Sequence, residues 1–417
     1  MRTFAATADE ERFGPTWLRA VLALALLYYP VCGIAGLPFG NGGRYANVLA
    51  GPLALLFLLA GHRSGWSDLA REGWRFLAPF AAFLAACLLT LLVHTHPDVG
   101  DPFSRVLWTV PIVLAARRLG LTRAAVFSAA AVGALFYLGT AVHDVYFNGS
   151  LRAGTKANEV IFAQTASLCA GLAFIGAICE RQSSPLMRAG WLAAGVAGIV
   201  AVAMTGSRGP LLATLWLVLL LGVPASRNGN RAAALIALMA VALALAVASS
   251  LGPLSDRFQL ALKEFETYYG AAQPPLTSIG IRLELWRIAL ASMPDHWLLG
   301  YGYSTLAELA PRLPALQALP KDLLQGLHHF HADWAHALMA GGLVLLAGVF
   351  VTAAALLYQA RSDAGRCWLV GAMVIFGFSD IAFFRKPTLT LFVASYGLLL
   401  AARDTPSNAS TPSPVSR

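Results

Sequence analysis

Charged side chains are scarce in this 417-residue chain, where Asp, Glu, Lys and Arg together make up 12% of the sequence. A soluble globular domain carries about 25% of these residues. Hydrophobic residues make up 58%, and they gather in long runs with almost no polar face. Because a soluble helix needs a polar face, this composition excludes an ordinary soluble helical domain. It predicts an all-α polytopic membrane protein.

Cysteine is also rare, and its five positions lie inside or at the edge of apolar runs. None is spaced with another as a metal site requires, and no disulfide framework is implied. The predicted outer segments contain no Asp-x-Asp pair, which argues against a divalent metal in phosphate chemistry. The sequence therefore predicts buried thiols, no cofactor and no metal. Its polar start also predicts the absence of a cleavable signal peptide.

The apolar runs predict about twelve membrane spans in one transmembrane domain, residues 1–403. Residues 404–417 are rich in Ser and Pro and are predicted to be a disordered cytoplasmic tail. The fourth and eighth spans are short for a membrane crossing. The predicted spans are 16–37, 45–60, 76–93, 104–116, 124–142, 158–179, 189–205, 210–224, 232–250, 333–357, 367–383 and 388–402.

The basic residues orient these spans. The net charge of +9 does not indicate nucleic acid, because Lys and Arg lie in the links between apolar runs. Seventeen of the thirty fall on the side of the N-terminus, and only seven fall in short links on the opposite side. Basic residues favour the cytoplasmic side, so both termini are predicted inside. The long polar segment 251–332, between the ninth and tenth spans, is then a periplasmic loop.

The orientation rule disfavours the seven outer basic residues, so we expect them to have a function that retains them there. Five lie in the short segments RAGTK, TGSRGP and FFRKP, as Arg152, Lys156, Arg208, Arg385 and Lys386. Cations concentrated on one face make a site for an anion such as phosphate. Snorkelling toward lipid headgroups is the alternative. For Arg208 the anion site is favoured, because Gly206, Gly209 and Pro210 suit a turn into a helix N-terminus.

The loop 251–332 contains two predicted helices. Residues 256–269 have the spacing of an amphipathic helix that lies on the bilayer or on the bundle. In the second, 277–293, Arg282 and Trp286 share one face, and Arg287 is rotated off it by about 100°. A glycine-aromatic turn, HWLLGYGYST, follows at 296–305 and contains Tyr301.

Four histidines, His328, His329, His331 and His336, lead into the tenth span. Together with Asp333 they could ligate a metal, although zinc sites commonly include Cys, which the loop lacks. A histidine that acts as a base or as a hydrogen-bonding group is the favoured interpretation.

These pieces, in this order, resemble the O-antigen ligase family. They are RAGTKANEVIFA at 152–163, TGSRG at 205–209, RLELWRIAL at 282–290, LLGYGYST at 298–305, and His331 ahead of WAHALMAGGLVLLAG. His331 and Gly342 match the family's histidine motif. The sequence departs from that motif at Ala332, where the family has Asn, and at Leu345, where the family has a smaller residue. The looser first motif contributes Asn158.

The resemblance implies a type C glycosyltransferase-like fold in the bacterial inner membrane. It also implies transfer of a glycan from undecaprenyl diphosphate to a hydroxyl of lipid A-core on the periplasmic face. Membrane lipid is the other expected partner.

A mechanism follows from these residue types. A sugar hydroxyl is a poor nucleophile, and a histidine can remove its proton as the new bond forms. We assign this role to His331. Arg208 and Arg282 are predicted to stabilise the leaving diphosphate, without metal and with inversion. Further substrate-binding candidates are Arg152, Lys156, Asn158, Arg287, Tyr301, His328, Arg385 and Lys386.

Three other functions fit parts of the pattern. An O-antigen repeat-unit polymerase and a protein O-oligosaccharyltransferase use the same donor on the same face. The single dominant outer loop and the lack of a large C-terminal domain favour a ligase. A lipid-linked glycan transporter would instead be expected to bury charged groups at mid-membrane depth. The predicted spans contain few, and Glu159 and Asp380 lie near outer ends.

Overall fold

The computed structural model describes residues 42–60, 66–94, 97–154, 158–228, 254–270, 277–303 and 305–403, with isolated positions between 235 and 242. Every regular element in these ranges is a helix, and one isolated bridge joins Thr122 to Arg403. The predicted all-α class is therefore confirmed for the described residues. The predicted tail, 404–417, lies outside them.

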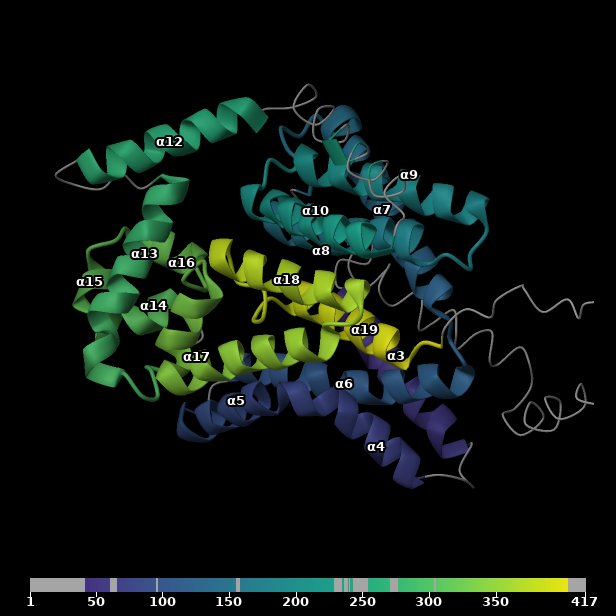
Figure 1. The fold of residues 1–417 in the computed structure, drawn as a ribbon. Helices are drawn as coiled ribbons and strands as arrows, with labels where there is room; N and C mark the ends of the chain where they lie inside the picture. Colours follow the sequence, from purple (N-terminus) through teal and green to yellow (C-terminus); the bar gives the residue numbers. More distant parts are fainter. Residues whose placement is uncertain are drawn as a thin grey trace, which may run out of the picture.

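The helices pack into a bundle with a separate group of short helices at one end (Figure 1). The elements are α3 (Gly42–Ala60), α4 (Trp66–Leu77), η2 (Ala78–Phe80), α5 (Ala81–His94), α6 (Pro97–Leu119), α7 (Arg123–Val142), η3 (His143–Phe147), α8 (Glu159–Cys179), α9 (Pro185–Met204), α10 (Arg208–Asn228), α12 (Leu254–Gly270), α13 (Ser278–Ser292), η4 (Met293–His296), α14 (Leu306–Leu309), η5 (Ala310–Arg312), α15 (Pro314–Gln317), α16 (Lys321–Gly326), α17 (Asp333–Ala360), α18 (Ala364–Ser379) and α19 (Lys386–Ala401).

Ten of the twelve predicted spans coincide with these helices. The first, 16–37, lies outside the described residues, as does most of the ninth, 232–250. Five helical stretches are long and apolar enough to cross a membrane, and four shorter apolar helices accompany them. This pattern is that of a multi-pass membrane protein. The number of crossings stays a prediction.

Helix α8 lies at the centre of the bundle. In its membrane-length window 89% of the residues are buried, because α7, α9, α10, α18 and α19 all pack against it. Glycines permit the close approach: Gly171 faces the indole of Trp368, and Gly195 faces the ring of Phe174. Small residues at helix contacts are the usual means of packing helices in a membrane.

The loop predicted between the ninth and tenth spans folds as helices. The two predicted amphipathic segments form α12 and α13, and α12 extends from α13 along the edge of the molecule (Figure 1). The proline-rich stretch that follows forms four short helices, because Pro311 and Pro314 stand in first turns, where no backbone N–H is needed.

The glycine-aromatic turn is inserted into a break in α17. The backbone of α17 leaves helical geometry at Gly341 and Gly342, and Gly342 has φ +65°. The turn supplies the missing partners: Tyr301 and Gly302 donate to the carbonyls of Met339 and Ala340 at 2.8 and 3.1 Å. In return, Leu343 and Val344 donate to the carbonyls of Trp297 and Leu298. Irregular backbone is tolerated here because protein surrounds it and pairs its polar groups.

Gly342→Ala should therefore destabilise the protein. Its φ favours glycine, and a Cβ would overlap the backbone of Leu298. We expect a loss of about 1–3 kcal/mol or more, measured as a lower thermal unfolding temperature in detergent. The matched control is Gly190→Ala in α9, where a Cβ meets nothing within 4 Å. Equal unfolding temperatures for both variants would refute this role of the break.

Candidate functional site

A polar cavity of about 390 Å³ opens at the end of the bundle beside the short helices. Five segments that are distant in the sequence line it. They are the start of α8 with Arg152, the turn 206–210, the first turns of α13, residues 326–331, and residues 379–385. Most are segments that the sequence places on the outer side.

The turn before α10 brings Arg208 to the cavity. Gly206 adopts φ +65°, which a glycine accepts without strain, and Arg208 begins α10. A Cβ on Gly209 would overlap the hydroxyl of Ser379, so glycine is needed for this turn to approach the 379–385 segment. Arg152 fixes the same turn from the other side, donating from Nε to the carbonyl of Thr205 at 2.6 Å.

Helix α13 presents Arg282 to the cavity. Thr277 caps the helix by accepting from the Gly280 amide, and Trp286, one turn after Arg282, donates to the carbonyl of Phe330 at 3.0 Å. This bond holds the Arg282 face of α13 against the histidine segment. Arg282 is half-buried and has no ion pair or hydrogen bond among the described residues. A cation placed this way can bind an anion from outside the protein.

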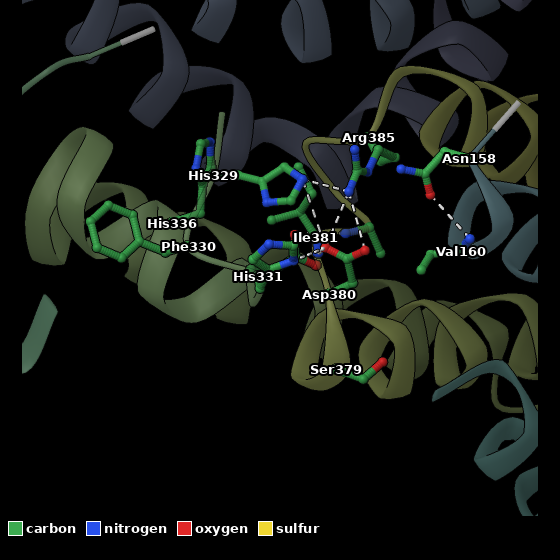
Figure 2. Close-up of polar contacts among 12 residues, drawn as sticks. Asn158, Val160, His329, Phe330, His331, His336, Ser379, Asp380, Ile381 and Arg385 are labelled. Atoms are coloured by element: carbon green, nitrogen blue, oxygen red, sulfur yellow. Dashed lines mark hydrogen bonds and ion pairs between the residues drawn. The ribbon is translucent and has the colours of Figure 1, made fainter. Parts of the chain in front are cut away.

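Asp380 gathers the charged groups at the other wall (Figure 2). Nδ1 of His331 lies 3.5 Å from its Oδ1, and Arg385 donates from Nη2 to its carboxylate at 3.1 Å. The same Nη2 also donates to Nε2 of His329. Asp380 is only 2% exposed, so these contacts replace the water that a carboxylate would otherwise bind.

These contacts determine the protonation states. Burial alone would raise the pKa of Asp380, but His331, Arg385 and His329 outweigh it and hold that pKa below its usual range. Burial, followed by the charge of Arg385, lowers the pKa of His329 to about 2. Asp380 is therefore ionised and His329 neutral at physiological pH, with the Nε2 lone pair of His329 facing Arg385.

Two residues of the cavity wall have strained backbones. In the described part of the chain, Asn158 (φ 72°) and His331 (φ 51°) are the non-glycine residues with positive φ. Both line the cavity, although their positions in the sequence are far apart. Such conformations cost about 1–3 kcal/mol each and concentrate at functional sites.

A buried carboxylate ties the two halves of this wall together. Asp333 follows His331 by two residues and is 4% exposed. Its Oδ1 accepts from the amide of Ala382 at 2.9 Å and its Oδ2 from that of Phe383 at 3.1 Å. Gln164 of α8 supports the same segment by donating to the carbonyl of Ile381. The backbone between Asp380 and Arg385 is thus fixed relative to His331.

The structure gathers many of the predicted site residues and leaves others apart. The predicted residues that line the cavity are His331, Arg208, Arg282, Arg152, Asn158, His328 and Arg385. Arg287 points elsewhere and pairs with Glu284. Lys386 pairs with Asp101, and the hydroxyl of Tyr301 donates to the carbonyl of Ser292. Lys156 lies outside the described residues.

Several residues that form the site were not among its predicted catalytic and substrate-binding residues. Asp380, His329 and Glu159 line the cavity, and Asp333 orders one wall. Their signal was weak: an acidic residue at the end of an apolar run, as at Asp380 and Glu159, is costly unless it is paired. The sequence does not show which basic residue pairs with each of these carboxylates.

The cavity can bind a doubly negative ligand beside a proton acceptor. Four arginines and two carboxylates line it, an excess of two positive charges when the histidines are neutral. Glu159 pairs with Arg152 at 3.4 Å, and Asp380 pairs with Arg385. Arg208 and Arg282 supply the remaining charge. His331, with one ring nitrogen directed at Asp380, can use the other toward a bound group.

Comparison with known proteins matches one part of the chain. A family model described as O-antigen ligase matches residues 193–350. The matched region contains Arg208, Arg282 and the histidine segment, whereas Arg152, Asp380 and Arg385 lie outside it. No curated protein matches the chain.

Replacing Asp333 tests its role as a tether. Asp333→Ala leaves two buried amides unpaired, a cost of about 1–3 kcal/mol for each group. We expect a lower unfolding temperature in detergent, whereas Asp333→Asn, which retains one acceptor oxygen, should lose less. Asp322→Ala is the control, because that side chain is exposed on α16. Wild-type stability of Asp333→Ala would show that the tether is dispensable.

Proposed function

We propose that this chain, whose residues 193–350 match the family model described as O-antigen ligase, transfers O-antigen from undecaprenyl diphosphate to a sugar hydroxyl of lipid A-core at the periplasmic face of the inner membrane. The observation that carries the proposal is the cavity in which His331 and Asp380 stand together with Arg208 and Arg282.

His331 acts as the general base. Its Nδ1 faces Asp380, so Nε2 is left to accept the proton of the acceptor hydroxyl. The carboxylate stabilises the imidazolium that forms and orients the ring, as in other His–Asp pairs. The strained backbone at His331 supports this role, because the strain is retained at the residue that must reach the substrate.

The arginines act on the leaving group. As the bond between sugar and phosphate breaks, negative charge increases on the diphosphate, and cations already in place stabilise it without rearrangement. The cavity's excess of two positive charges matches the two charges of a diphosphate diester. Arg282 carries this role most directly, because its guanidinium has no counter-ion in the described part of the chain.

Direct attack by the hydroxyl on the anomeric carbon forms the new glycosidic bond as the phosphate oxygen departs with the bonding electrons. The configuration at that carbon is then inverted, and the proton passes to His331. Binding without chemistry, as in a transporter, would not require the His331–Asp380 pair.

Reconstitution with defined substrates tests the proposed reaction. Purified protein, a lipid-diphosphate glycan and lipid A-core should give the joined product with no ion gradient, a result that a transporter would not give. In cells, loss of a ligase leaves bare core and lipid-linked polymer. Loss of a polymerase would instead leave single repeat units on the core, and that outcome would reassign the protein.

His331→Ala should lower the rate of transfer by about 10²–10⁴-fold, the usual contribution of a general base. Asp380→Asn should lower kcat without removing the imidazole. His143→Ala, an exposed histidine outside the cavity, is the matched control and should transfer normally. The assay is the lipopolysaccharide ladder, with membrane insertion checked in parallel. A near-normal ladder from His331→Ala would remove it as the base.

Arg282→Ala should lower kcat/KM for the donor by about 10²-fold, as expected for loss of a charge that stabilises the leaving group. Arg287→Ala on the same helix is the matched control. Its exposed pair with Glu284 contributes little, so we expect a change within about threefold. Equal losses in both variants would show that the position of Arg282 in the cavity is irrelevant.

A further inference from the structure

Two histidines and one carboxylate in the cavity wall converge on a single point. One ligand atom from each of His329, His331 and Asp380 lies within 4.8 Å of the others. Oδ1 of Asp380 lies 3.5 Å from Nδ1 of His331 and 3.9 Å from Nε2 of His329. Figure 2 shows both rings turned toward this carboxylate.

These separations are near those of a tetrahedral zinc site. With metal–nitrogen bonds of about 2.0–2.1 Å, neighbouring ligand atoms lie about 3.3–3.4 Å apart. Small ring rotations would bring the three atoms to that spacing. Two imidazoles and one carboxylate are also a donor set that suits Zn²⁺ and its neighbours.

The three groups include a ring nitrogen that makes no hydrogen bond within the described chain, and they face the cavity. Nδ1 of His331 is buried and has no hydrogen-bond partner within the described chain. His329, His331 and Asp380 all line the cavity, so an ion can enter from it and take a fourth ligand there. A buried ring nitrogen that makes no hydrogen bond can coordinate a metal ion when its proton is on the other ring nitrogen.

Arg385 contacts two of these three groups. Its Nη2 donates to both His329 and Asp380, which are two of the three ligands. A metal ion must displace this guanidinium and tolerate its charge nearby. Binding is therefore weaker than at a structural zinc site, and it is antagonised by one identified residue.

We propose that His329, His331 and Asp380 bind Zn²⁺ or a similar transition-metal ion, and that the bound ion inhibits the enzyme. An imidazole that coordinates through Nδ1 carries its proton on Nε2. His331 then presents an N–H to the cavity in place of a lone pair and cannot accept a proton from the acceptor. The inhibition rests on the proposed function, whereas the binding does not.

Cobalt binding tests the site directly. Full-length protein without a histidine tag is purified in detergent and titrated with Co²⁺, whose visible absorption intensifies in tetrahedral coordination, and Zn²⁺ is then added as competitor. We expect one Co²⁺ per chain, displaced by Zn²⁺. Asp380→Asn should weaken binding by at least about tenfold, since it removes a ligand rather than a supporting group.

Arg385→Gln gives the decisive comparison. Removing the competing cation should tighten Co²⁺ binding by about tenfold, a gain that misfolding cannot produce. His143→Ala removes an exposed histidine, 3.9 Å from Asp144, and should leave binding unchanged. Absence of the tetrahedral spectrum, or binding unaffected by Asp380→Asn and by Arg385→Gln, would overturn the site.

Transfer assays separate the site from the proposed function. Zn²⁺ should inhibit transfer, and a chelator should restore it. If Co²⁺ and Zn²⁺ bind with the expected variant pattern and transfer is unaffected, the metal site stands and the role of His331 as base fails. If neither ion binds while His331→Ala still abolishes transfer, the metal site fails and the enzyme mechanism stands.

Discussion

The site depends on one buried carboxylate that accepts hydrogen bonds from two backbone amides. Asp333 begins α17, directly after the histidine segment, and holds the amides of Ala382 and Phe383 between α18 and α19. These segments are about fifty residues apart in the chain. Together with the bonds of Arg385 to His329 and Asp380, this link fixes the distance between His331 and Asp380 against movement of α17 relative to α18. A carboxylate suits the task, since it accepts from two donors at once.

The cavity beside Asp333 is lined by four arginines but only two carboxylates, so its lining has an excess of positive charge. Arg152 and Arg385 have carboxylate partners within the cavity, whereas Arg282 has none among the described residues. Half-buried charge is costly without a partner. Under the proposed function an anionic substrate would offset this cost, so the affinity for the donor and the arrangement of the arginines would have the same origin.

The sequence was sufficient for the fold class and for much of the site. Apolar runs located the helices because membrane helices must satisfy their own backbone. The spacing of Arg282, Trp286 and Arg287 predicted that Arg287 lies off the face of Arg282, since helical geometry is local. Naming Arg287 a substrate-binding candidate was nevertheless wrong, because it lies outside the cavity and pairs with Glu284. TGSRG and the histidine segment were recognisable because both are short, continuous motifs.

Other parts of the site could not be derived from local pattern. Arg385 and Lys386 are adjacent in the sequence, yet one faces Asp380 and the other Asp101, a choice made by how α19 enters the bundle. The partner of Asp380 depends on contacts across about fifty residues. The role of Asp333 was also hidden, because its partners are backbone amides that no side-chain pattern reveals.

The break in α17 also divides this helix into a short part next to the histidine segment and a part long enough to cross a membrane. Beyond Gly342, α17 continues for eighteen residues to Ala360, about 27 Å of helix. This length nearly spans the hydrocarbon layer of a bilayer, about 30 Å, on its own. The segment from Asp333 to Ala340 is therefore not needed for a crossing, and under the proposed function it would hold the cavity at the level of the phosphate headgroups. A lipid-borne diphosphate would reach it by lateral diffusion, with its isoprenoid tail never leaving the acyl chains.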